Sequence, residues 1–269
     1  MKTFISAAAL AAVTATASPA VAQSSDTNSD NNDSSIFIVT VGPGMRLRPE
    51  FPGARDRELA FYPLIQVRKA GTDPVFATPD QSLGVSLLKS EGFRAGPAIR
   101  LGQRRDEDDA IPGIGNVKRA IEVGGFAEYY LSPNLRARGE LRKGFGGHKG
   151  LLADLGADMI VGKVTGPFHF SIGPRARLAD GKYARAFYGV DAQQSAATGL
   201  EMHEAGGGLQ SLGALGSMKY RMNGGFGVQG YARYQRLLGD AADSPLVRSS
   251  VGSRNQFEVG MGLTYSFGI

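Results

Sequence analysis

The segment FEVGMGLTYSF, residues 257–267, places apolar side chains in strict alternation with polar or small ones. Its odd-numbered positions, from Phe257 to Phe267, are all apolar, and its even-numbered positions are Glu258 followed by glycine, threonine and serine. Successive side chains of a β-strand point to opposite faces, so the segment predicts one unbroken strand of about ten residues. One face of this strand is apolar and the other is polar.

The same alternation recurs along the chain and predicts an all-β protein. The predicted strands span residues 36–48, 59–70, 73–78, 82–89, 93–103, 119–131, 134–144, 151–163, 167–178, 207–222, 225–237 and 255–268. This count of twelve is even, which places both termini of the chain on the periplasmic side of an outer membrane. Ten strands is the alternative, because only a short link separates 73–78 from 82–89, where a long loop is expected.

The composition excludes several other classes of protein. Glycine makes up 38 of the 269 residues, which disfavours a helical bundle because each glycine destabilises a helix interior by roughly 1 kcal/mol. The chain has no cysteine, so disulfide frameworks, thiolate metal sites and cysteine nucleophiles are excluded. Beyond Ser35 there is no apolar run of about 18 residues, so the sequence excludes helical membrane spans as well.

The first 35 residues are predicted to lie outside the folded body. Residues 1–22 combine Lys2, a weakly apolar run and a terminal Ala20-Val21-Ala22, which is typical of a signal peptide cleaved after Ala22. Residues 23–35 lack apolar side chains and are predicted to be a disordered leader. The body therefore comprises residues 36–269, and the signal peptide predicts export from the cytoplasm.

Loop lengths indicate which face of the strands points inward. A soluble barrel and a membrane barrel share the same alternation, with inside and outside exchanged. Short links such as 132–134 and 165–167 alternate with longer polar or glycine-rich stretches such as 179–206 and 238–254. This arrangement is typical of outer-membrane barrels with periplasmic turns and extracellular loops. We therefore predict an antiparallel transmembrane β-barrel whose apolar face contacts lipid.

Charged residues on the polar faces are predicted to line the lumen, where opposite charges on neighbouring strands can pair. These lumen charges are Arg94, Arg100, Glu122, Glu128, Arg136, Arg138, Glu140, Arg142, Asp154, Asp158, Arg175, Arg177, Arg233 and Glu258. Lys219 and Arg221 lie on the same face. Aromatic residues near the short turns, including Tyr129, Phe168 and Phe226, are expected to form an interfacial belt. Tyr265 and Phe267 at the end of the last strand are expected to form the assembly signal.

Motifs for catalysis or cofactor binding are weak. The hexapeptide GFGVQG at 225–230 matches a dinucleotide fingerprint, but it lies inside a predicted strand, where that motif does not function. His148 near Asp154 and His203 near Ser195 are the only pairs that could suggest a hydrolase. The acidic run at 106–109 lacks the spacing of a calcium loop. We therefore expect no enzyme activity, no cofactor and no metal site.

The partners indicated by charge are membrane lipids. Basic residues alternate with acidic ones along the predicted strands and form no basic patch with interleaved aromatic residues, so nucleic acid is not expected to bind. We therefore expect the chain to contact outer-membrane lipid and lipopolysaccharide instead of nucleic acid.

Several stretches of the body match a known family. They are LRPEFPGARDRE at 47–58, YPLIQVR at 62–68, GFGGHKGLLADLGAD at 144–158, QSAATGL at 194–200, AGGGL at 205–209, LLGDAADSPLV at 237–247 and GSRNQFEVGMGLTYSF at 252–267. Together they cover the chain from about residue 40 to its end, and this set resembles the MipA/OmpV family of outer-membrane proteins. The resemblance implies a barrel that links a periplasmic murein lytic transglycosylase and a murein synthase to the outer membrane as a scaffold. Two alternatives stay open, a small-solute channel and a surface adhesin or antigen.

Overall fold

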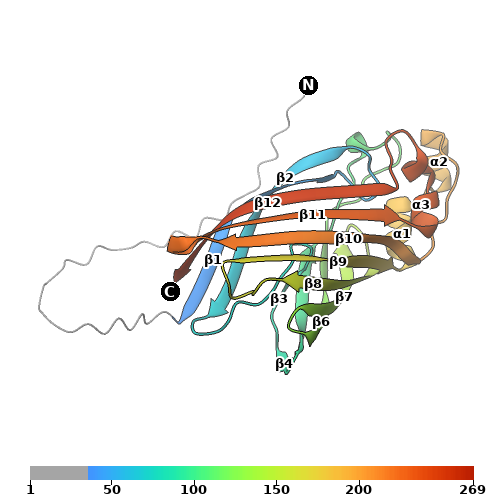
Figure 1. Cartoon of the computed structure of the whole chain (residues 1–269). Coiled ribbons are helices and arrows are strands. Elements are labelled where there is room, and N and C mark those ends of the chain that lie inside the picture. The colour runs from blue at the N-terminus through green and yellow to red at the C-terminus, as the bar shows by residue number, and fades with distance from the viewer. Residues whose placement is uncertain (1–35) are drawn as a thin grey trace, which may run out of the picture. The chain divides into compact units, whose positions relative to one another are not determined.

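The computed structural model describes residues 36–269, which form one curled antiparallel sheet (Figure 1). Its strands are β1 (Phe37–Pro49), β2 (Arg57–Lys69), β3 (Leu83–Gly84), β4 (Leu88–Ser90), β5 (Phe93–Leu101), β6 (Ala120–Ser132), β7 (Leu135–Gly146), β8 (Leu151–Val161), β9 (Phe168–Ala179), β10 (Gly208–Arg221), β11 (Phe226–Leu237) and β12 (Asn255–Gly268). The strand order is β2-β1-β12-β11-β10-β9-β8-β7-β6-β5-β3, and β4 also pairs with β5. The predicted all-β fold of twelve antiparallel strands is confirmed. The predicted signal peptide and leader lie outside the described residues.

The strand predicted at 73–78 is wrong, and the one predicted at 82–89 is divided. Residues 73–78 form no strand, and Pro74 and Pro79 each lack the N–H that a sheet ladder needs. Strand β3 pairs with β5 at Ala98 and Ile99, and β4 pairs with β5 from Phe93 to Ala95. Pro97 lies between these two patches and interrupts the ladder, so β3 and β4 together occupy one position beside β5.

Proline also marks the other edge of the sheet. Pro63 of β2 lies directly opposite Pro43 of β1. Two prolines can face each other only where neither has to donate a hydrogen bond to the other, so the nitrogen of Pro63 faces away from β1. A proline at this position limits the pairing of β2 with any further strand.

The outer face of the sheet carries aromatic residues near both ends of the strands. Phe168 pairs with Tyr220 across β9 and β10, and Phe226 pairs with Tyr265 across β11 and β12. Tyr234 pairs with Phe257 at the other end of β11. Phe226 and Tyr234 lie eight residues apart on one face of β11, and a strand rise of about 3.3 Å with a tilt of about 40° separates them by roughly 20 Å along a membrane normal. This spacing is close to the height of the apolar band of an outer-membrane barrel, about 25 Å.

The longer connections form a helical cap at one end of the sheet (Figure 1). It contains α1 (Gly181–Tyr188), α2 (Ala192–Thr198), α3 (Gly239–Asp243) and α4 (Pro245–Arg248), and the 102–119 connection also contributes, with the short helix η1 (Glu107–Asp109). None of the helices among residues 36–269 is long and apolar enough to cross a bilayer.

The cap contains a hydrophobic core of its own. Tyr183, Phe187 and Tyr188 of α1 are buried against residues of α3 and α4 and the ends of the strands. Arg105, which is 2% exposed, donates hydrogen bonds to the carbonyl oxygens of Phe187 at 2.9 Å and Ile114 at 3.3 Å. Burial lowers the pKa of Arg105 to about 10 and raises that of Tyr183 to about 12.

Candidate functional site

Arginine and carboxylate side chains fill the inner face of the sheet over β6 to β9. Arg136 of β7 lies 2.5 Å from Asp158 of β8 and 3.2 Å from Glu128 of β6. All three residues are at most 3% exposed. Ionised side chains on three adjacent strands therefore compensate one another inside the sheet, as buried charges require.

Arg142 of β7 is the second centre of this network. Its guanidinium lies 3.0 Å from Glu122, 2.5 Å from Glu140 and 2.5 Å from Asp154. Asp154 also accepts a hydrogen bond from Nε of Arg177 at 2.7 Å. These charge-assisted hydrogen bonds link β6, β7, β8 and β9 through their side chains.

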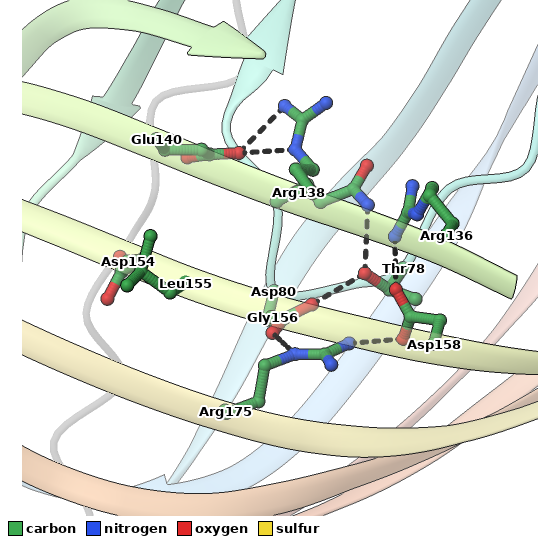
Figure 2. Close-up of a pocket in the computed structure, with 11 residues that line it drawn as sticks. Thr78, Asp80, Arg136, Arg138, Glu140, Asp154, Leu155, Gly156, Asp158 and Arg175 are labelled. Atoms are coloured by element: carbon green, nitrogen blue, oxygen red, sulfur yellow. Dashed lines mark hydrogen bonds and ion pairs between the residues drawn. The ribbon is translucent and has the colours of Figure 1, made fainter. Parts of the chain in front are cut away.

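The chain between β2 and β3 lies against this network, and we call residues 73–82 the inner segment. Asp80 of the inner segment accepts a hydrogen bond from Arg175 of β9 at 2.7 Å, and Ser82 Oγ lies 2.5 Å from Glu140 of β7. The ring of Phe76 is buried, and the guanidinium of Arg136 lies over it at 4.5 Å. Figure 2 shows Asp80 directed toward Arg175, whose guanidinium reaches Asp158.

Little free space remains between the inner segment and the network. The cavity lined by these side chains has a volume of about 30 Å³, which is room for about one water molecule. Gly156 of β8 contributes to the tight packing, because a Cβ at this position would lie 3.0 Å from the side chain of Arg175. The space between the inner segment and the charged network is therefore small.

A smaller charged cluster lies on β11, β12 and the neighbouring β1. Glu258 pairs with Arg233, accepts a hydrogen bond from the Tyr231 hydroxyl at 2.6 Å and lies 3.7 Å from Arg46. The phenol ring of Tyr231 lies over Gly260, where a Cβ would come within 2.3 Å of it. Glycine therefore makes room here for a side chain of the inner face.

The structure places all fourteen residues predicted as lumen charges on the inner face, each in an ion pair. The pairs not described above include those of Arg94 with Glu128, Arg100 with Asp154, and Arg138 with Glu128 and Glu140. The sequence does not indicate the inner segment, because it predicts a strand at 73–78, where the structure has none. No local pattern identifies Asp80 or Ser82 as partners of β7 and β9, which follow them by more than fifty residues.

The histidines considered as catalytic have other partners in the structure. His148 Nε2 lies 3.2 Å from Glu122, and its ring packs against Tyr183. His203 bonds the carbonyl oxygen of Asp240 at 2.9 Å, while the Ser195 hydroxyl donates to Leu200. Asp106 of the acidic run pairs with Arg104. Over residues 36–269, no group of three or more histidine and carboxylate side chains is arranged to hold a metal ion.

An aromatic and apolar outer face, a charged inner face and long antiparallel strands define the class of protein, an outer-membrane β-barrel. The chain belongs to the MipA family, because the family model described as MltA-interacting protein MipA matches residues 41–267. No curated protein matches the chain.

Similar solved structures are outer-membrane proteins. Neisserial surface protein A is 12% identical with a TM-score of 0.26, covering 87% of this chain and 98% of its own. The outer-membrane channel DcaP of Acinetobacter baumannii is 8% identical with a TM-score of 0.38, covering 86% and 96%. OccK11 (OpdR) of Pseudomonas aeruginosa is 13% identical with a TM-score of 0.31, covering 88% and 97%.

Proposed function

We propose that this outer-membrane protein is a non-enzymatic scaffold that holds a murein lytic transglycosylase and a murein synthase at the inner surface of the outer membrane. The observation that carries this proposal is the inner face filled by ion pairs and by the inner segment. A barrel filled in this way presents its rims to partners. The family's description as MltA-interacting supports a protein partner.

A small-solute channel is the second candidate, because the inner face is rich in charge. The cavity of about 30 Å³ beside the inner segment weighs against it. Conductance measurements in planar bilayers distinguish this alternative from the scaffold.

We also propose that the chain is exported with residues 1–22 as a signal peptide. N-terminal sequencing of the protein purified from membranes tests this, and a mature chain beginning at Gln23 is the expected result. A chain that still begins at Met1 would contradict it.

The scaffold proposal is tested by retention of the transglycosylase on the immobilised full-length mature protein. The chain has no cysteine, so a single one can be labelled selectively. Lys163, in the short β8–β9 turn, and Lys149, in the β7–β8 connection, are both exposed and lie at opposite ends of β8. We expect retention at micromolar concentration to fall at least tenfold when Lys163→Cys carries a bulky maleimide-polyethylene glycol.

The matched control is Lys149→Cys with the same label, which is expected to retain the transglycosylase as the unlabelled protein does. Retention of nothing by the unmodified protein would exclude the scaffold. Equal loss with both labels would exclude the short-turn rim as the binding surface.

A further inference from the structure

Toward the short-turn end of the strands, some cations of the inner face have no carboxylate partner within the part of the chain that the structure describes. In the middle of the sheet and toward the cap, the inward arginines of the strands each have a carboxylate partner, as with Arg46, Arg142 and Arg175. At the short-turn end, Arg94 of β5 also has a carboxylate partner, Glu128. Three further inward cations lie at this end, Arg68 of β2 and Lys219 and Arg221 of β10. Within residues 36–269, none of these three forms an ion pair with a carboxylate.

Their hydrogen-bond partners are all uncharged. Lys219 Nζ reaches the side-chain oxygen of Gln66 at 3.3 Å. Arg221 Nη2 bonds the carbonyl oxygens of Val164 and Gly166, each at 2.5 Å, and Arg68 Nη1 bonds that of Thr72 at 2.7 Å. An ammonium has three donors and a guanidinium has five, so each group keeps donors that these bonds do not use.

The three cations lie near one another. Lys219 and Arg221 are two residues apart on one face of β10. Lys219 reaches Gln66 of β2, which is two residues from Arg68 on the same face of that strand. All three side chains are half-buried. Like charges gathered at a partly desolvated position repel one another unless an anion compensates them.

The side chain of His169, in the same region, has a buried nitrogen without a hydrogen-bond partner among the described residues. His169 of β9 lies directly opposite Lys219 in the sheet and is 6% exposed, and its Nδ1 has no hydrogen-bond partner among residues 36–269. Beside Gln66, the hydroxyls of Thr40 and Ser266 bond each other at 2.7 Å. The region therefore combines three positive charges with neutral groups that can donate to oxygen atoms.

From this juxtaposition we infer that Arg68, Lys219, Arg221 and His169 form a binding site for a phosphate group at the short-turn end of the barrel interior. A phosphate dianion compensates most of the charge of the three cations and accepts several hydrogen bonds at once. The aromatic belt formed by Phe168, Tyr220 and Phe226 lies at this end, which is the depth of lipid headgroups in a membrane. Phosphate can therefore come from a lipid headgroup or from a soluble phosphate compound.

Calorimetric titration of the purified full-length mature protein in detergent tests the site, with inorganic phosphate and, separately, dihexanoylphosphatidylglycerol as probes. Sodium chloride keeps the ionic strength equal in all titrations. We expect at least one probe to bind, and Lys219→Gln to weaken that binding about tenfold, as expected for the loss of one charge-assisted contact. Binding of inorganic phosphate supports the site and indicates a soluble source, and binding of the lipid alone supports it and indicates a headgroup.

Lys149→Gln is the matched control, because it removes the same charge from an exposed position at the cap end. It is expected to bind as the unsubstituted protein does. A different migration of boiled and unboiled samples shows that each variant is folded. Binding of neither probe, or equal weakening by Lys149→Gln, would overturn the inference, whatever the outcome for the scaffold.

Discussion

At the level of single residues, the interior of the barrel depends on arginines that each contact several carboxylates. Arg142 contacts three of them, on three strands, and its side chain is 0% exposed. Removing one member of a buried charged group costs more than the pair itself contributes, because the remaining charges lose their compensation. The three carboxylates Glu122, Glu140 and Asp154 therefore make Arg142 a sensitive position.

We predict that Arg142→Met destabilises the folded barrel by about 3–5 kcal/mol. The measurement is the midpoint temperature at which the unboiled form disappears on a gel. Arg236→Met is the control, since Arg236 is exposed and its guanidinium bonds the uncharged side chain of Asn255, and it is expected to change stability by less than about 0.5 kcal/mol. Equal midpoints for Arg142→Met and the unsubstituted protein would contradict this account of the network.

At the level of elements, the inner segment covers the inner face of the sheet over β7 and β9, and we expect it to obstruct the passage of solutes. Its contacts with the wall are polar at Asp80 and Ser82 and aromatic at Phe76. These contacts bring residues 73–82 against β7 and β9 and leave β2 and β3 as the sheet edges.

We expect the unsubstituted protein to show no conductance steps in planar bilayers, and a variant with residues 74–81 replaced by a glycine-serine linker to conduct. Replacement of residues 192–199, a stretch of equal length in the cap that contains no buried residue, is the control and should leave the bilayer silent. Steady conductance of the unsubstituted protein would favour the channel over the scaffold.

The first helix of the cap depends on a single capping residue. The Asp180 carboxylate accepts a hydrogen bond from the backbone N–H of Tyr183 at 3.0 Å. Burial alone would raise the pKa of Asp180, but the backbone hydrogen bonds outweigh it and hold the pKa below its ordinary value of 3.8. A carboxylate with a lowered pKa stabilises the folded state above its unfolded pKa, and this contribution is lost as the pH falls through the folded value.

We therefore predict that α1 loses order below pH 3.8, and that Asp180→Ala weakens it at neutral pH by about 1 kcal/mol. Hydrogen-exchange protection of the α1 amides, corrected for intrinsic rates, is the measurement. Helix α2 has its own capping box at Asp191, so its protection should not change in Asp180→Ala. Unchanged protection of α1 in this variant would show that the tertiary contacts of Tyr183 and Phe187 hold the helix without its cap.

At the level of the whole molecule, one continuous sheet joins the first described strand to the last. Strand β1 pairs with β12 from Ile38 to Leu47 and with β2 along its whole length. Side-chain networks then connect strands that are not neighbours, as where Lys219 of β10 reaches Gln66 of β2. A sheet stabilised by backbone pairing and also by side-chain contacts between distant strands is expected to unfold cooperatively and slowly.

We predict heat-modifiable migration on a gel. The unboiled sample is expected to run as a compact form, because the hydrogen-bonded sheet resists detergent until it is heated. Identical migration of boiled and unboiled samples would contradict the fold itself.

The sequence by itself determined the strands, their two faces and the class of protein. A period of two is local information, so it identified both the apolar residues of β12 and the fourteen charges of the inner face. Ion pairing between neighbouring strands could be anticipated, because opposite charges recur at inward positions of consecutive strands. The strand prediction failed at 73–78, because Pro74 and the adjacent Pro79 lack the N–H that a sheet ladder needs.

Only the tertiary structure decided how the interior is filled. The contacts of Asp80 with Arg175 and of Ser82 with Glu140 join residues far apart in the chain, and their geometry depends on how the whole sheet curls. The same applies to the basic group of Arg68, Lys219 and Arg221. Side chains of β2 and β10 approach each other across the inner face only after the sheet has folded. Alternation fixes the direction of each side chain, but register and curvature fix which side chains meet.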